Sequence, residues 1–330
     1  MPSRFRALLL TQQDHQTRAE LRAVDDHDLP PGDVTVAVRH STLNYKDALA
    51  ITGRGAVVRA WPMVPGIDLA GMVAESDHPD WRPGDPVVVT GWGLGETRWG
   101  GLAERARLDA GALLAPPAGF TAADCMAVGT AGVTAALALM ALLDHGLSPG
   151  AGPLLVTGAA GGVGSVAVAL AAGLGLEVVA STGRPEEEPY LSALGAAQIL
   201  HRSELSQPGK PLQRERWAGV IDTVGSHTLA NALAATRWNG AVAACGLAGG
   251  ADLPGTVMPF ILRGVTLYGI NSVFVPNPKR ARAWELIATA VGLKKIRRMS
   301  EEIGLSEVIA VAPRFLEGKV RGRLVVDVGR

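Results

Sequence analysis

Residues 158–164 read GAAGGVG and follow the apolar run PLLVT at 153–157. Glycine stands at positions 158, 161 and 164, a spacing that suits a tight turn between a buried strand and a helix. Such a turn lets a pyrophosphate approach the backbone, and the helix N-terminus supplies free N–H groups and a partial positive charge. Because tight turns also use glycine for packing alone, the motif indicates a dinucleotide site only together with its flanks.

The stretch VVASTGR at 178–184 ends the next apolar run, about 20 residues after the glycine turn. In NAD-binding units an Asp or Glu near this point holds the ribose 2′-hydroxyl. This chain has Ser181, Thr182, Gly183 and Arg184 there, and its next acid is Glu186. Hydroxyl donors and a guanidinium suit a 2′-phosphate, so the sequence favours NADP(H). The alternative is a polar loop start with an exposed arginine.

The order of strand and helix patterns divides the chain into two parts. The first 120 residues are punctuated by Gly and Pro and predict a small, mostly antiparallel, barrel-like unit. Its expected strands are 33–40, 69–76, 86–91 and 102–108. From Thr121, a helix N-cap, helices alternate with apolar strands, which predicts a doubly wound parallel sheet. Its expected strands are 153–159, 177–183, 218–225, 241–249 and 265–271, and its expected helices include 162–174 and 227–236. A helix at 281–291 and a strand at 323–328 close the chain.

Composition sets the broad class of the protein. A chain of 330 residues is long enough for about two domains. Lys plus Arg equals Asp plus Glu, 31 each, which gives no electrostatic argument for binding nucleic acid or an anionic membrane. Only Cys125 and Cys245 occur, so a disulfide framework and a four-cysteine zinc site are excluded.

Two segments bear on the compartment. The N-terminus has only a four-residue apolar run, too short for a secretory segment, and we therefore expect a cytoplasmic protein. Residues 146–176 carry no charge and exceed the length of a membrane span. Their many glycines and two prolines favour a buried strand with its following helix, so we expect no membrane span there.

Further motifs extend from residue 41 to residue 328. They are STLNYKD (41–47), PGIDLAG (65–71), VTGAAGGVGS (156–165), IDTVG (221–225), MPFILRGVTLYGI (258–270) and GRLVVDV (322–328). In this set the chain resembles the zinc-independent branch of the medium-chain dehydrogenase/reductase superfamily, and within it the acrylyl-CoA reductase and quinone oxidoreductase group. Asn44 and Ile67 stand where the zinc enzymes of the superfamily carry Cys and His ligands, so the resemblance implies no metal.

The resemblance implies an α/β fold. It combines a Rossmann doubly wound parallel sheet with a β-rich, GroES-like partial-barrel catalytic domain. Residues 1–124 and 279–330 are expected in the catalytic domain and residues 125–278 in the NADP-binding domain. The strand at 265–271 reads as an edge of the Rossmann sheet with few charges, so we expect a homodimer through it.

The implied reaction is the NADPH-dependent reduction of the activated C=C bond of acrylyl-CoA to propanoyl-CoA, by hydride transfer without metal. Two alternatives stay open at this point. One is an NADPH:quinone oxidoreductase, so the small-molecule substrate is an acyl-CoA or a quinone. The other is a non-enzymatic sensor that binds a dinucleotide on the same fold.

Candidate catalytic residues lie in the segment that replaces the metal-binding loop. Tyr45, one of only three tyrosines, is the leading candidate and either donates a proton, holds the cofactor or merely packs. Asn44 offers an amide donor to the oxyanion, and Asp47 orders the loop. The predicted cofactor contacts, taken from position and resemblance, are Tyr45, Thr157, Ala160, Gly161, Gly162, Val163, Ser181, Thr182, Gly183, Arg184, Arg202, Gly246, Leu247, Ile270 and Arg323.

Some arginines have two interpretations. Arg202 reaches the adenine or 2′-phosphate side, or is a surface charge. Arg263 and Arg323 are candidates for the substrate's phosphates or the nicotinamide amide. The run PKRAR at 278–282 attracts CoA phosphates or forms a solvated face.

Overall fold

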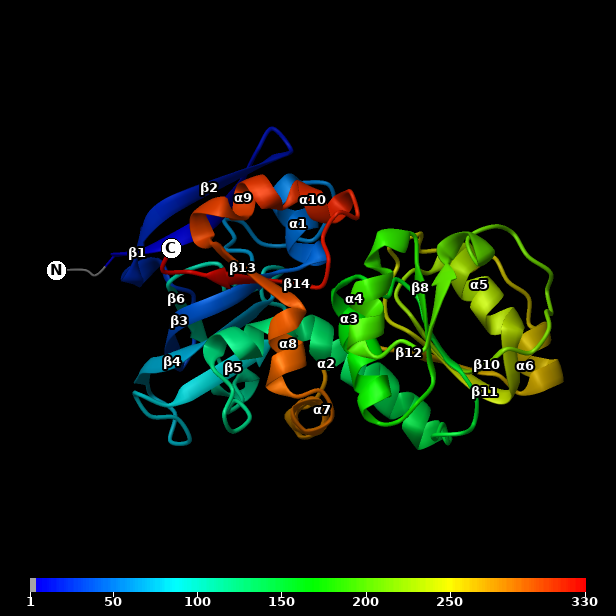
Figure 1. Ribbon diagram of the computed structural model, residues 1–330. Coiled ribbons are helices and arrows are strands. Elements are labelled where there is room, and N and C mark those ends of the chain that lie inside the picture. The colour runs from blue at the N-terminus through cyan, green and yellow to red at the C-terminus, as the bar shows by residue number, and fades with distance from the viewer. Residues whose placement is uncertain (1–3) are drawn as a thin grey trace. The chain divides into compact units, whose positions relative to one another are not determined.

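A computed structural model describes residues 4–330, which form two compact units (Figure 1). The first unit takes the chain through Thr130 together with Val273–Ala281 and Ile296–Arg330. The second unit takes Ala131–Ser272 and Arg282–Lys295. The chain therefore passes from the first unit to the second and returns, so that Arg4 and Arg330, the ends of the described part, both belong to the first unit.

The first unit is built on strands that pair antiparallel, except for the parallel pair β13 and β14. Its six-stranded sheet has the order β13-β14-β3-β4-β5, with β6 paired to β3. The strands are β3 (Val34–Leu43), β4 (Asp68–Ser76), β5 (Pro86–Thr90), β6 (Arg105–Leu108), β13 (Ser300–Gly304) and β14 (Arg323–Asp327). Because β14 pairs with both β3 and β13, the last strand of the chain is an interior strand of this sheet.

A separate hairpin begins the first unit. Its strands β1 (Arg4–Gln13) and β2 (Gln16–Asp25) pair antiparallel along their whole length. The two residues of the turn, Asp14 and His15, both have positive φ, as a type I′ turn requires. Short helices α1 (Tyr45–Thr52), α9 (Val308–Val311) and α10 (Pro313–Leu316) complete the unit.

The second unit holds a six-stranded, entirely parallel sheet with the order β12-β11-β10-β7-β8-β9. The strands are β7 (Leu154–Val156), β8 (Val178–Thr182), β9 (Gln198–His201), β10 (Trp217–Asp222), β11 (Thr236–Ala244) and β12 (Thr266–Gly269). Numbered within this sheet, the order is 3-2-1-4-5-6, that of dinucleotide-binding domains. Every residue of β7 and β8 is buried, as expected for strands covered on both faces.

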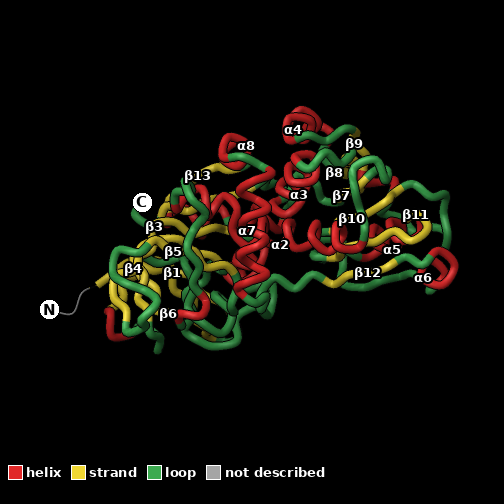
Figure 2. The backbone as a smooth tube through the Cα atoms, turned by 90° about the horizontal axis from the view of Figure 1, so that it is seen from below, coloured by secondary structure: helices red, strands yellow, loops and turns green. Residues whose placement is uncertain are grey.

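Helices α3 (Gly162–Gly173), α4 (Glu188–Leu194), α5 (Ser226–Ala235) and α6 (Met258–Arg263) belong to the second unit. Figure 2 shows α4 near β8 and β9 at one end of the sheet and β12 at the other end, beyond β11. Three helices have residues in both units: α2 (Ala122–His145), α7 (Asn277–Ala290) and α8 (Leu293–Arg298).

Helix α2 starts with the expected cap. Thr121 and Asp124 exchange hydrogen bonds, with the Thr121 N–H donating to Asp124 at 3.0 Å and the Asp124 N–H donating to Thr121 Oγ1 at 3.1 Å. By length and composition α2 is apolar enough to cross a membrane, but 83% of its most apolar window is buried inside the protein. It departs from helical geometry at Gly129, where φ is 52°.

The predicted fold class is confirmed, with local differences. The strand expected at 241–249 is β11, which ends at Ala244. The chain leaves the sheet there and packs closely on the segment that follows β10: a Cβ on Gly246 would lie 2.3 Å from the Thr223 carbonyl oxygen. The strand expected at 102–108 forms only from Arg105, and residues 258–263, quoted above only as a motif, form helix α6.

Candidate functional site

The glycine turn has the geometry that its sequence predicts. Strand β7 ends at Val156 and helix α3 starts at Gly162, with Gly158 at a φ of 58°. A Cβ on Gly164 would lie 2.3 Å from the Gly158 carbonyl oxygen, so only glycine fits where helix and turn meet. These two glycines are therefore required by the backbone, whichever ligand binds there.

The start of α3 suits an anion. Gly161 caps the helix in an extended conformation, and the first turn carries no acidic side chain. Gly161, Gly162 and Val163 are half-buried, whereas Thr157 and Ala160 are buried at 1% and 3% exposure. The twelve-residue helix thus presents unpaired N–H groups and its positive dipole end at a partly open surface. This cradle fits a dinucleotide pyrophosphate.

The tip of β8 is basic. Ser181 and Thr182 are buried at the end of the strand, and the Arg184 N–H donates to Thr182 Oγ1 at 3.1 Å. The Arg184 guanidinium donates to the Ala160 carbonyl at 3.3 Å and lies 3.5 Å from Glu187. Arg184 is therefore held beside the glycine turn.

A second guanidinium lies at the same tip. A Cβ on Gly183 would lie 2.3 Å from Nε of Arg202, so the Arg202 side chain packs against the Gly183 backbone. Arg184 and Arg202 thus bring two positive charges to the residues that follow β8. Arg202 is nevertheless exposed, so its contact with a 2′-phosphate stays a prediction beside the alternative of a surface charge.

The later predicted cofactor residues follow the carboxyl ends of β11 and β12. Gly246 and Leu247 come just after β11, and the Leu247 side chain is 60% exposed. Ile270 follows β12 and its N–H donates to the Ala244 carbonyl at 3.0 Å. In an open parallel sheet ligands bind outside the carboxyl ends of the strands, and these residues lie at that edge.

Asp222, at the end of β10, is a buried carboxylate that the residue predictions did not single out. It is 0% exposed, and burial raises the pKa of its carboxyl. Thr157 Oγ1 donates to it at 2.7 Å and the Gly225 N–H at 2.8 Å. An acid at the end of the apolar run AGVID was the available signal, but its partner Thr157 precedes it by 65 residues.

In the first unit, Asn44 and Asp47 form a capping box at the start of α1. The Asn44 N–H donates to Asp47 at 2.9 Å, and the N–H groups of Gly66 and Ile67 donate to its other oxygen at 3.1 and 3.0 Å. Burial raises the pKa of Asp47 to about 6 against these hydrogen bonds. Asp47 therefore orders two loops, as its expected role requires.

Asn44 belongs to a wider buried polar cluster centred on Asp68. Its amide nitrogen donates to Asp68 at 3.0 Å and to Thr42 at 2.6 Å. Thr42 Oγ1 in turn donates to Asp68 at 2.7 Å, and the Thr130 N–H donates to Asp68 at 2.9 Å. Asp68, absent from the predicted residues, is therefore the principal acceptor of this cluster.

Arg323 completes the Asp68 cluster. It is 2% exposed, donates to Asn44 Oδ1 at 2.9 Å and to the Ala127 carbonyl at 3.2 Å, and lies 3.9 Å from Asp68. Burial lowers the pKa of its guanidinium, and the charge of Asp68 opposes that shift. The structure thus gives Arg323 partners within the first unit, while its predicted contact with the cofactor stays a prediction.

Tyr45 is the exposed member of the loop. Its side chain is 43% exposed, whereas Asn44 and Asp47 on either side are 8% and 2% exposed. The next residue, Lys46, donates to Glu96 at 2.6 Å. A rigid, capped helix start therefore presents a phenol to solvent between fixed neighbours.

Two other arginines are held by the protein itself. The Arg263 guanidinium donates to the carbonyls of Ala234, Thr236 and Gln213. Arg280, in the run expected to be solvated or to attract CoA phosphates, is 1% exposed and donates to Thr90 and to carbonyls of the 273–275 segment. Both expectations fail for Arg280, because its guanidinium is enclosed by these acceptors.

The positions of the superfamily's zinc ligands are taken by other groups. The Asn44 amide serves as donor to two carboxylates, and Ile67 offers no ligand atom. Among residues 4–330 two groups of three potential ligands occur, Asp25/His27/Asp28 and His40/Glu302/Asp327, and neither includes a residue named above as catalytic.

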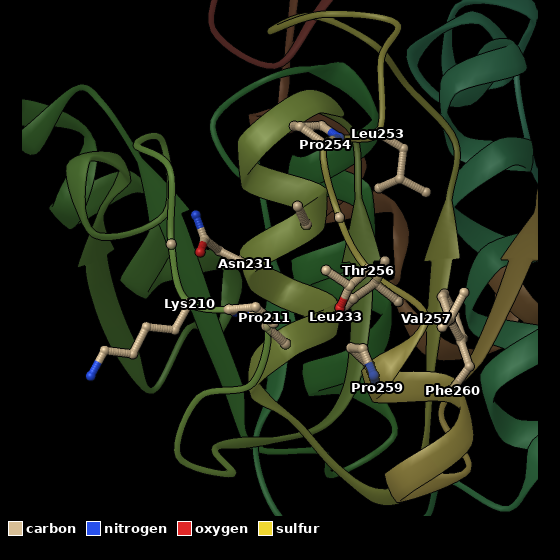
Figure 3. Close-up of a pocket in the computed structure, with 14 residues that line it drawn as sticks. Lys210, Pro211, Asn231, Leu233, Leu253, Pro254, Thr256, Val257, Pro259 and Phe260 are labelled. Carbon is tan, nitrogen blue, oxygen red and sulfur yellow. The ribbon is translucent and has the colours of Figure 1, made fainter.

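A separate hollow of about 340 Å³ lies beside α5 and α6 (Figure 3). Its wall is largely apolar, with Leu233, Val257 and Phe260, while the Lys210 side chain extends away from it. None of the predicted cofactor residues lines it.

Comparison with known proteins agrees with this geometry. Residues 30–120 match the alcohol dehydrogenase GroES-like domain and residues 162–289 match the zinc-binding dehydrogenase family. Acrylyl-CoA reductase AcuI of Ruegeria pomeroyi is 51% identical over 98% of this chain and 99% of its own.

Two solved structures are also similar over nearly the whole chain. YhdH of Escherichia coli with bound NADPH is 50% identical, with a TM-score of 0.96 over 98% of this chain and 99% of its own. YhfP of Bacillus subtilis, a putative quinone oxidoreductase solved with NAD bound, is 38% identical, with a TM-score of 0.95 over 99% of this chain and 100% of its own. The chain therefore belongs to the medium-chain dehydrogenase/reductase superfamily, in the group of oxidoreductases that contains the acrylyl-CoA reductases and their quinone oxidoreductase relatives.

Proposed function

We propose that this protein reduces the activated C=C bond of acrylyl-CoA to propanoyl-CoA, with NADPH as the reductant and without a metal. The single observation that carries this proposal is the 51% identity over essentially the full chain to an acrylyl-CoA reductase. The residues after β8 support the choice of NADPH, since Arg184 follows the strand, Arg202 packs against Gly183 and no acid takes the place of the NAD-type carboxylate.

In this reaction bound NADPH supplies a hydride to the β-carbon of the unsaturated thioester, and a proton adds at the α-carbon. The residues proposed to hold the cofactor are the glycine turn with Thr157, the 181–184 tip, Arg202 and the strand ends at Gly246, Leu247 and Ile270. Thr157 and Ala160 act through their backbone and through the shape of the turn, since both are buried.

The first unit supplies the proton and the oxyanion partner in this proposal. We assign the proton to the Tyr45 hydroxyl, since Tyr45 is the exposed side chain of the fixed 44–47 loop. Asn44 is 8% exposed and its amide already donates to Thr42, Asp47 and Asp68, so its expected contact with the oxyanion requires one of these hydrogen bonds to break. In this proposal Arg323 orients Asn44 by donating a hydrogen bond to its Oδ1. A contact between Arg323 and the nicotinamide would add to this role.

The same proposal gives each part of the chain a task. The expected catalytic domain, residues 1–124 and 279–330, corresponds to the first unit, and the expected NADP-binding domain, residues 125–278, corresponds to the second. The exceptions are residues 125–130 and 273–278, which belong to the first unit, and residues 282–295, which belong to the second. The proposal also includes a cytoplasmic location, and the balanced charge of 31 basic and 31 acidic residues supports the absence of nucleic-acid partners.

We also propose a homodimer. Strand β12 is an edge of the parallel sheet, so its outer backbone groups can pair with a second copy. Beside it, Val257, Ile261 and Leu262 at α6 are 64%, 71% and 58% exposed, next to the apolar hollow of Figure 3. Light scattering during gel filtration is expected to give a dimer mass, and Ile261→Asp a monomer. A monomeric wild-type protein at micromolar concentration refutes this part.

The reaction is tested by NADPH oxidation with acrylyl-CoA, crotonyl-CoA and a series of quinones at matched concentrations. The proposal expects the highest kcat/KM for acrylyl-CoA. The second candidate, a quinone reductase, is supported by the 38% identical relative and expects quinones to be preferred. Tight NADPH binding without turnover of any of them favours the dinucleotide sensor.

A further inference from the structure

A set of buried and half-buried hydrogen bonds joins the ends of two neighbouring strands in the second unit. Strands β7 and β10 are paired up to Val156 and Ile221, so the residues that follow them lie side by side. Thr157 Oγ1 donates to Asp222 at 2.7 Å and accepts from the Thr223 N–H at 3.0 Å. Thr223 Oγ1 then donates to the Thr157 carbonyl at 2.9 Å. Asp222 and Thr223 thereby hold both the backbone and the side chain of Thr157 in place.

Thr223 also fills the space between two turns. A Cβ on Gly158 would lie 2.2 Å from Thr223 Oγ1, and one on Gly246 would lie 2.3 Å from the Thr223 carbonyl oxygen. Thr223 therefore touches the first residue of the glycine turn and the turn after β11. A shift of this residue moves both turns, because neither glycine leaves room for an independent adjustment.

Asp222 holds Thr223 in place. Its side chain accepts from Thr157 on one oxygen and from the Gly225 N–H on the other, at 2.7 and 2.8 Å. Its carbonyl accepts from the Cys245 N–H at 2.9 Å, which links β10 to the end of β11. All of these partners lie in the second unit and most are buried.

We propose that Asp222 and Thr223 are positioning residues for the dinucleotide. Together they set the spacing between the phosphate-binding turn at 158–164 and the turn at 246–247. This inference rests on the NADP(H) site described above. A competing explanation is that the same hydrogen bonds only hold the sheet together, so the experiment must separate cofactor affinity from stability.

The decisive variant is Thr223→Val, which replaces the hydroxyl by a methyl group of similar size. It removes the donor to the Thr157 carbonyl, and we expect the Kd for NADPH, measured by isothermal titration, to rise about five- to tenfold, the effect of one lost hydrogen bond. Thr223→Ser keeps the hydroxyl and is expected to bind NADPH like the wild type. If Thr223→Val does not fold, Thr223→Ala removes the same donor without a new methyl contact.

Thr236→Val is the matched control. Like Thr223, Thr236 donates its hydroxyl to a backbone carbonyl, that of Ala232 at 2.8 Å, but it is fully buried where Thr223 is half-buried, and it lies at the opposite end of β11. The melting temperature of Thr236→Val should therefore fall at least as much as that of Thr223→Val, with an unchanged Kd for NADPH. The inference is overturned if Thr223→Val binds NADPH as tightly as the wild type, or if Thr236→Val weakens binding equally. A wild-type protein that binds no NADPH overturns the cofactor assignment itself.

Discussion

Replacement of Arg184 by alanine tests how the protein distinguishes NADPH from NADH. The guanidinium already donates to the Ala160 carbonyl at 3.3 Å and lies 3.5 Å from Glu187. A charged hydrogen bond is worth about 1.5–3 kcal/mol. When the guanidinium binds a 2′-phosphate it gives up these existing contacts, and this loss offsets part of the binding free energy. We therefore expect the lower half of that range, about 1.5–2 kcal/mol, or roughly 10- to 30-fold weaker NADPH binding.

The measurement is a pair of titrations, NADPH and NADH, on each variant. NADH lacks the 2′-phosphate, so its affinity should change little in Arg184→Ala. Arg237→Ala is the control, since Arg237 is also half-buried and donates to a backbone carbonyl, that of Ala151 at 3.0 Å. Arg237 lies at the amino end of β11, whereas the candidate cofactor residues lie at the carboxyl ends of the strands. It should leave both affinities unchanged. Equal losses for NADPH and NADH in Arg184→Ala refute the reasoning, because the arginine then supports the turn without recognising the phosphate.

Three further predictions concern the first unit. Tyr45→Phe should lower kcat substantially and leave NADPH affinity unchanged; a wild-type rate shows instead that water donates the proton. Hydrogen bonds from Arg297 hold the pKa of Asp124 at about 2. The contribution of the ionised Asp124 to folding stability is therefore complete above pH 4 and is lost as the pH falls toward 2. Because Arg297 is 61% exposed, Asp124→Asn should cost only about 1–2 kcal/mol at pH 7 in urea unfolding, and no change contradicts this. Burial raises the pKa of Asp47 to about 6, so folding stability should fall as the pH rises from about 4 to about 6, by up to about 3 kcal/mol. Asp47→Asn should remove this dependence of folding stability on pH. If the dependence is unaltered in Asp47→Asn, another group causes it.

Much of the second unit, and the start of helix α2 that leads into it, follows from local sequence. The glycine spacing at 158–164, the apolar strands and the Thr121 cap each depend on residues within a few positions of one another, and each is found as predicted. The 3-2-1-4-5-6 strand order then follows from the alternation of strands and helices. The expected end of β11 lies too late in the sequence, because the position of that end depends on a contact with Thr223, which follows a different strand.

The interior of the candidate site was less accessible from sequence. Asn44 and Arg323 are 279 residues apart along the chain, yet their side chains are hydrogen-bonded. Asp68 stands in the apolar stretch PGIDLAG, and its partners come from β3, α2 and β14. Arg280 looked like one charge of a surface run and is enclosed by backbone acceptors. Such long-range pairing leaves no period or spacing in the sequence.

The proposed reaction is tested most directly by following the transferred hydrogen. NADPH carrying deuterium at the transferable position is incubated with acrylyl-CoA and the protein, and the acyl product is analysed by mass spectrometry and NMR. We predict propanoyl-CoA with the deuterium at its β-carbon, formed in equal amount to the NADPH consumed. Absence of labelled propanoyl-CoA from a protein that oxidises NADPH with a quinone contradicts the proposal.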